Sequence, residues 1–137
     1  SETGQKTEET NYKDGKLDGS MTRWHENGQK AEEGNYKDGI LNGIYTKWYD
    51  NGQKEYESRK LQGKRHGLQG RWSLDGQIRD ASKWAMGKII VAKSRKPNGE
   101  RCPVTNVKDG NGVVVEYQDD GAEKYRWTYK DGERVRD

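Results

Sequence analysis

Residues 28–51 read GQKAEEGNYKDGILNGIYTKWYDN, and residues 4–27 before them read GQKTEETNYKDGKLDGSMTRWHEN. The two segments align without a gap, so glycine and aromatic residues recur every 24 positions. The same interval separates Gly4, Gly28, Gly52 and Gly76, and also Trp24, Trp48 and Trp72. A fixed period of this length indicates a repeat protein, in which each unit packs mainly on its neighbours.

The repeat extends over the whole chain, with lower fidelity towards the C-terminus. The third copy has Lys60 where tyrosine is expected, and the interval falls to 23 residues at Gly99 and 22 at Gly121. We therefore expect one repeat domain over residues 1–137. Its approximate units are 4–27, 28–51, 52–75, 76–98, 99–120 and a partial unit 121–137.

The composition excludes an ordinary globular core. Only 28% of the residues are hydrophobic, 36% are charged and there is no phenylalanine, whereas about 45–50% apolar residues is usual. Such a chain could not fill the interior of a two-layer sandwich. Disorder is the alternative that this composition suggests, but five tryptophans, eight tyrosines and a strict period oppose it. A thin, single-layer structure satisfies both observations.

Each unit contains two turn signals, which divide it into strands. Asp-Gly and Asn-Gly pairs recur 11 to 13 residues apart, as at Asp38-Gly39 and Asn51-Gly52. These pairs tolerate the positive φ angles of a type I′ hairpin turn, and the segments between them are too short for a regular helix. The sequence predicts an all-β fold: an elongated, single-layer antiparallel meander of about ten to twelve strands, built from β-hairpin repeats of about 24 residues.

Alternation along the strands predicts a ladder of aromatic rings on one face of the sheet. We expect this face to be the binding surface, although the rings could simply supply the packing that a thin sheet needs. Gly19, Gly43 and Gly67 fall within strands, and we expect a ring from a neighbouring strand to lie over each of them. The residues of the predicted ladder are Tyr12, Trp24, Tyr36, Trp48, Trp72, Trp84 and Tyr117.

The pattern YKDGxLxGxxTxWxxNGQK, present at residues 12–30 and 36–54, resembles the MORN-variant repeat of bacterial proteins often described as YwqK-type antitoxins. The resemblance is strong up to Asn51 and weaker after Gly87, where Ile89-Ile90-Val91-Ala92 replaces the pattern. It implies hairpin repeats in an elongated twisted sheet, with no enzyme activity and no cofactor. It also implies scaffolding between proteins or, for some members, binding to phospholipid head groups. A bend or an insertion is expected after Gly87.

Residues for catalysis or metal binding are not found in a functional pattern. The acidic pairs Glu8-Glu9 and Glu32-Glu33 recur at the repeat period, so they indicate repeat surface rather than a general acid and base. Cys102 is the single cysteine, and with only two histidines the chain has no metal-ligand spacing. We predict that the protein is not an enzyme and has neither a metal nor a cofactor.

The middle of the chain is basic. Residues 54–101 contain 13 Lys and Arg against five Asp and Glu, whereas residues 1–53 and 102–137 are net acidic. The functional interpretation is an anion-facing patch, and the alternative is a solvated surface that prevents aggregation at sheet edges. The irregular segment 54–101 is therefore the first place to look for a specific site. The residues of the predicted patch are Arg59, Lys60, Lys64, Arg65, His66, Lys93, Arg95 and Lys96.

The sequence leaves the compartment open. No stretch approaches the roughly 20 apolar residues of a membrane span, and the start at Ser1 slightly favours a processed, extracytoplasmic chain over a cytoplasmic one.

Three functions are compatible with these observations. The first is a non-catalytic scaffold that binds a protein partner through its sheet face. The second is binding to anionic lipid or glycan at a membrane or cell surface, and the third is a structural spacer or a fragment of a longer array. Nucleic acid is the least favoured partner, because no recognition fold is present. Pairing of edge strands into a dimer is a further possibility.

Overall fold

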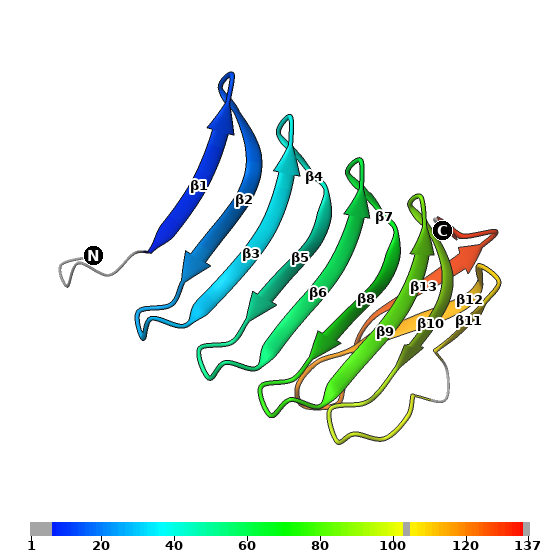
Figure 1. Cartoon of the computed structure of the whole chain (residues 1–137). Coiled ribbons are helices and arrows are strands. Elements are labelled where there is room, and N and C mark those ends of the chain that lie inside the picture. The colour runs from blue at the N-terminus through cyan, green and yellow to red at the C-terminus, as the bar shows by residue number, and fades with distance from the viewer. Residues whose placement is uncertain (1–6, 103–104, 136–137) are drawn as a thin grey trace.

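The computed structural model describes residues 7–102 and 105–135, which form one antiparallel sheet of fourteen strands (Figure 1). The described residues form no helix. The strands are β1 (Glu8–Lys13), β2 (Lys16–Trp24), β3 (Lys30–Lys37), β4 (Ile40–Leu41), β5 (Gly43–Trp48), β6 (Lys54–Leu61), β7 (Lys64–Arg65), β8 (Gly67–Trp72), β9 (Ile78–Ala85), β10 (Lys88–Ser94), β11 (Asn106–Lys108), β12 (Asn111–Tyr117), β13 (Glu123–Lys130) and β14 (Glu133–Val135).

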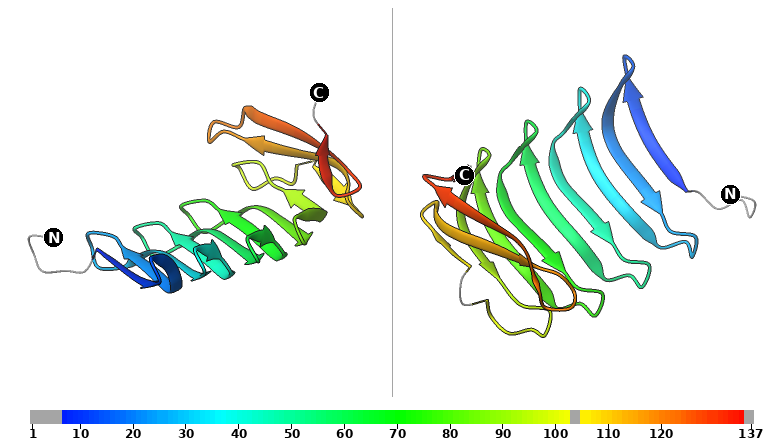
Figure 2. Two further views of the ribbon diagram at one scale, coloured as in Figure 1. Left: turned by 90° about the horizontal axis from the view of Figure 1, so that it is seen from above. Right: turned by 180° about the vertical axis from the view of Figure 1, so that it is seen from behind.

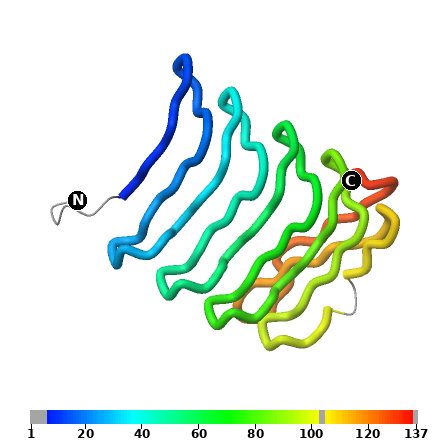
Figure 3. The backbone as a smooth tube through the Cα atoms, viewed as in Figure 1, coloured from blue at the N-terminus to red at the C-terminus, as the bar shows by residue number. Residues whose placement is uncertain are grey.

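Strand order follows chain order, so each strand pairs with the next along the sequence. The path contains twelve strands, and the short strands β4 and β7 pair beside it with β3 and β6. This arrangement confirms the predicted all-β meander of hairpin repeats. In Figure 3 the backbone rises and falls in successive, nearly equivalent turns from β1 to β10.

The hairpin turns are of two kinds, which alternate along the chain. At Asp38-Gly39 both residues have positive φ, 50° and 80°, which is the type I′ geometry that the sequence predicts. At Asn27-Gly28 only glycine has positive φ, and the loop is longer. There the Gly28 N–H donates to the carbonyl of His25, and the Asn27 side chain accepts a bond from the Gln29 N–H. Because the two kinds of turn alternate, the type I′ turns of the repeats all lie at the same end of the strands.

Gly43 and Gly67 interrupt strands, but not for the reason expected from the sequence. Their φ angles are 101° and 98°, a conformation that glycine adopts without strain, and they are the first residues of β5 and β8, just after the breaks that follow β4 and β7. Asn35 and Arg59 side chains, not aromatic rings, lie over them, and Gly19 has Asn11 above it in the same way. The predicted ring over each of these glycines is thus wrong.

Aromatic rings instead lie over two other glycines within strands, Gly34 in β3 and Gly70 in β8. A Cβ atom added to Gly34 would lie 3.0 Å from Tyr45, and one added to Gly70 would lie 2.9 Å from the ring of Trp72. These two glycines make room for aromatic side chains on opposite faces of the sheet.

The predicted ladder of rings is divided between the two faces. Trp72 lies over Gly70, which pairs with Ala81, whereas Trp84 bonds to the hydroxyl of Ser82. Because Ala81 and Ser82 are neighbours in one strand, their side chains point to opposite faces. Trp24, Trp48 and Trp72 therefore lie on one face, here called the tryptophan face, and Tyr36 and Trp84 lie on the other. A continuous one-face ladder is incorrect.

The C-terminal strands fold back over the second face, here called the ionic face because it carries the ion pairs described below. Figure 2 shows β12 and β13 lying across the end of the sheet formed by β8 to β10. Strand β10 meets β11 at a single pair, Ala92 with Val107, which permits the sharp change of direction. The bend expected after Gly87 thus follows β10.

The fold-back creates the principal core. Trp84, Ile89, Ala92 and Val107 are buried together, with Val114 and Tyr129 packed against them. The apolar segment that breaks the repeat, residues 89–92, therefore supplies the surface on which the C-terminal hairpins pack. A buried bond of 2.6 Å from Ser94 to Thr105 fixes the crossing.

Candidate binding surfaces

The tryptophan face carries apolar side chains that water reaches. Ile44 is 53% exposed and Leu68 is 74% exposed at equivalent positions of successive repeats. Alternation places Ile44 on the face of Trp48 and Leu68 on the face of Trp72. Basic residues pair with them across the strands, Arg59 with Ile44 and Lys83 with Leu68. The face thus combines apolar and positively charged contacts.

The tryptophan rings are partly buried along this face. The ammonium group of Lys54 lies 5.8 Å from the centre of the Trp72 ring and also 2.6 Å from the carboxylate of Glu57. Lys30 and Glu33 form the equivalent ion pair one repeat earlier. The rings therefore serve partly as packing for the repeat, and their outer edges contribute to the exposed surface.

The ionic face carries cross-strand pairs of opposite charge. Arg23 lies 3.5 Å from Glu32, and the Tyr45 hydroxyl donates a hydrogen bond to that same carboxylate. Burial, with the bond to Glu32, raises the pKa of Tyr45. These bonds pair the polar groups of β2, β3 and β5 with one another.

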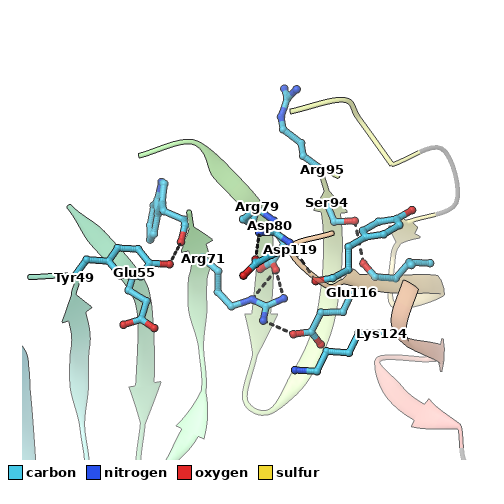
Figure 4. A pocket seen from close by; sticks show the side chains of 13 residues that line it. Tyr49, Glu55, Arg71, Arg79, Asp80, Ser94, Arg95, Glu116, Asp119 and Lys124 are labelled. Atoms are coloured by element: carbon cyan, nitrogen blue, oxygen red, sulfur yellow. Dashed lines mark hydrogen bonds and ion pairs between the residues drawn. The ribbon is translucent and has the colours of Figure 1, made fainter. Parts of the chain in front are cut away.

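Arg71 holds the fold-back to the sheet (Figure 4). Its guanidinium donates to Asp80 on β9, with Nε at 2.7 Å, and to Glu116 on β12. Burial raises the pKa of Asp80, and Arg71 opposes this shift. Burial would lower the pKa of Arg71, but the bonds to the two carboxylates outweigh it and the pKa is raised. This triad joins two parts of the chain 45 residues apart.

Two clefts flank the Arg71–Asp80–Glu116 triad. The ion-pair cleft, about 200 Å³, also contains Glu55, Arg79, Asp119 and Lys124. Arg79 donates to the Tyr117 carbonyl at 3.1 Å and pairs with Asp119 at 3.3 Å. Four basic and four acidic residues line this cleft, so its net charge is zero.

The aromatic cleft lies on the other side of the triad and has about 320 Å³. Its walls include Tyr56, Trp84, Trp127 and Tyr129, together with Arg65 and Arg134. The three arginines of this cleft, Arg71 among them, outnumber its two carboxylates, and Lys93 adds a fourth positive charge. The two clefts therefore differ in charge and in chemical character.

The predicted anion-facing residues do not form one patch. Lys60, Lys64, Arg65 and His66 cluster at the turn between β6 and β7, on one edge of the sheet. Arg95 and Lys96 follow the end of β10, at the opposite edge (Figure 1). His66 accepts a bond from the Met86 N–H, and Arg95 donates to the Gly99 carbonyl. The predicted basic residues therefore lie in two separate groups, and their role in binding an anion stays a prediction.

The predicted aromatic residues also have different environments. Tyr12 is 65% exposed on the edge strand β1, whereas Trp84 is 8% exposed in the core. The Tyr117 hydroxyl lies 2.9 Å from the Cys102 sulfur, and this bond raises the pKa of Tyr117 to about 12. Trp84 and Tyr117 therefore take part in packing and bonding within the fold, whereas Tyr12 is open to water.

Sequence reasoning missed Glu116, Asp119, Trp127 and Arg134 as cleft residues, because they lie in the segment where the repeat is weakest. The sequence pointed to the clefts only indirectly. The irregular segment 54–101 contains Arg65, Arg71 and Arg79, and these arginines line the two clefts together with the four missed residues.

Side chains for metal binding are not assembled in the described residues. No cluster of three His, Cys, Asp or Glu side chains suitable for a metal occurs within 7–102 and 105–135. Cys102 is buried. Within the same ranges, no helix has the length and apolar character needed to cross a bilayer.

A family model for the MORN repeat variant matches residues 17–38 and 41–59. These two matches lie within β2 to β6 and support a protein built from MORN repeats, which are commonly non-catalytic binding modules. The search of curated proteins gave no match.

Proposed function

We propose that this protein is a non-catalytic scaffold that binds a protein partner through its tryptophan face. The observation that carries the proposal is the pair Ile44 and Leu68, both more than half exposed at equivalent repeat positions. Large apolar side chains held in water by a regular sheet indicate an interaction surface. They lie in line across the repeats, as a partner that contacts several units would require.

Charge favours a partner with both apolar and acidic groups. Arg59 and Lys83 pair across the strands with Ile44 and Leu68, and basic residues at the rim of an interface steer an acidic partner towards it. Burial of two such side chains contributes about 1.5–3 kcal/mol each. The resemblance to YwqK-type antitoxins makes a bacterial toxin one partner to test.

The test is a comparison of two double variants in pull-down experiments from the source cell. Ile44→Ser with Leu68→Ser should lose a partner that the wild-type protein captures, because the apolar contacts are removed. Tyr12→Ser with Val135→Ser is the matched control, since it also removes two exposed hydrophobic side chains, 65% and 44% exposed, from the edge strands.

The captured partner is then purified and its dissociation constant is measured. We expect a loss of at least about tenfold for the first variant and little change for the control. Equal affinity for both variants, or failure of the wild-type protein to capture any partner, would refute the proposal. Because all four side chains are exposed, neither variant should unfold the sheet.

A further inference from the structure

We infer that the aromatic cleft is a second binding site, and that it takes a carboxylate from an acidic peptide segment. This site lies on the ionic face beneath the fold-back, so it is distinct from the tryptophan face and goes beyond the function proposed above. Its central groups are Arg65 and Arg134, which line the same cleft from β7 and β14.

Both arginines are held by aromatic rings rather than by carboxylates. The Arg65 guanidinium lies 4.8 Å from the centre of the Trp84 ring, and that of Arg134 lies 4.2 Å from the centre of the Trp127 ring. Among the described residues, neither arginine forms an ion pair with an acidic side chain. The planar edge that binds a carboxylate with two hydrogen bonds is therefore available on each.

Tyr129 connects the two arginines. Its ring packs edge-on against Trp84 at 6.2 Å, and its backbone pairs with Arg134 across the strands. Burial raises the pKa of the Tyr129 hydroxyl, while the positive charges of both Arg65 and Arg134 oppose that shift. The two guanidinium groups thus act on the same hydroxyl, from opposite sides of the cleft.

The surrounding charges favour a carboxylate over a more highly charged group. Arg71 is already paired with Asp80 and Glu116, which also line the cleft. These two acids would repel a doubly charged phosphate more strongly than a singly charged carboxylate. The aromatic walls add apolar contact for a peptide chain, which a small inorganic anion could not use.

The experiment uses the purified 137-residue protein and a fluorescein-labelled hexaglutamate peptide, and binding is followed by fluorescence anisotropy at low salt. Arg65→Gln with Arg134→Gln should weaken binding at least about tenfold. Lys64→Gln with Lys130→Gln is the matched control, since it removes the same charge from neighbouring exposed positions. The control should lose less than about threefold.

A titration of the wild-type protein locates the site independently of any variant. The NMR signals of the Arg65 and Arg134 Nε–H groups should shift, and that of Arg126, which is paired with Glu123, should not. Equal losses for the two double variants would overturn the inference, as would the absence of binding at low salt. Tighter binding of a phosphoserine peptide than of hexaglutamate would also overturn it.

The same probe separates this site from the tryptophan face. The Ile44→Ser, Leu68→Ser protein should bind hexaglutamate as the wild-type protein does, because its substitutions lie on the other face. Retention of that binding with loss of the protein partner would support both sites. Loss of hexaglutamate binding in this variant would place the peptide on the tryptophan face and overturn the inference.

Discussion

Gly112 shows how one residue permits the fold-back. Its φ angle is 140°, which side chains rarely tolerate, and a Cβ atom there would lie 1.8 Å from the carbonyl oxygen of Asn106. Only a residue without a side chain lets β11 and β12 approach in this way. The conformation and the close approach act together at this position.

Gly112→Ala should destabilise the protein by about 3 kcal/mol or more, because the strained φ angle and the steric clash add. Urea denaturation followed by tryptophan fluorescence measures the change. Gly121→Ala is the control: its φ of 90° is also strained, but no atom lies within 4 Å of the added Cβ. That variant should lose only about 1–2 kcal/mol, and equal losses would contradict the role of the close approach.

Arg71 shows how equivalent strand positions diverge. It occupies the repeat position of Arg23, 48 residues earlier. Arg23 lies 3.7 Å from Glu8 and 3.5 Å from Glu32 on the two adjacent strands, whereas Arg71 bonds closely to Asp80 and Glu116 and so holds β8, β9 and β12 together. The repeat provides the arginine, and the fold-back gives it a structural role.

Arg71→Gln should cost about 1–3 kcal/mol at pH 7, because two partly buried carboxylates lose a charged partner. Arg23→Gln should cost less than about 1 kcal/mol, as for other exposed ion pairs. Burial already raises the Asp80 pKa from 3.8, and removal of Arg71 would raise it further. The lost partner matters only when the Asp80 carboxyl is ionised. At low pH this carboxyl is protonated in the folded and the unfolded protein, so the cost of Arg71→Gln should be smallest below pH 3.8.

Urea denaturation of both variants between pH 3 and pH 7 measures this dependence. The deficit of Arg71→Gln should grow as the pH rises through the raised Asp80 pKa, whereas that of Arg23→Gln should change little. A deficit of Arg71→Gln that is constant over this range would show that Asp80 is not coupled to Arg71.

The faces of individual strands illustrate what sequence reasoning could reach. Alternation alone places Trp48 on the same face as Ile44, because both lie in one strand. The register between strands decides which residues of the neighbouring strand share that face. Glu32 pairs with Lys47 and Glu33 with Thr46, so an even-numbered residue always lies opposite an odd-numbered one. Even-numbered residues of adjacent strands, such as Tyr36 and Trp48, therefore lie on opposite faces. The predicted one-face ladder omitted this consequence of the hairpin register.

The meander could be predicted because its turns are encoded locally. Asp38-Gly39 adopts the positive φ angles that an Asp-Gly pair itself favours. The fold-back depends on contacts between distant residues, such as Arg71 with Glu116 and Ser94 with Thr105. The repeat period gives no indication of these contacts, so the aromatic cleft that they create could not be predicted from the sequence. The loss of the repeat after Gly87 indicated only where regularity would end.

Stability should differ between the two ends of the molecule, because burial is concentrated at one of them. The core residues Trp84, Ile89, Ala92 and Val107 lie where the C-terminal strands cover the sheet. Among the described residues of β1 and β2, only Met21 is buried. In repeat proteins each unit is stabilised chiefly by its neighbours, so the end strand β1, paired on one side only, should open without the rest.

Native-state hydrogen exchange tests this gradient. Amides of β9, β10 and β12 should exchange only through global unfolding, whereas those pairing β1 with β2 should exchange at least about tenfold faster by local opening. The urea dependence should be steep for the first group and shallow for the second, since local opening exposes less surface. The Arg71→Gln variant provides the internal comparison: it should accelerate exchange in β12 while leaving β1 and β2 unchanged. A single free energy of exchange for all strands would instead mean that the sheet unfolds as one cooperative unit.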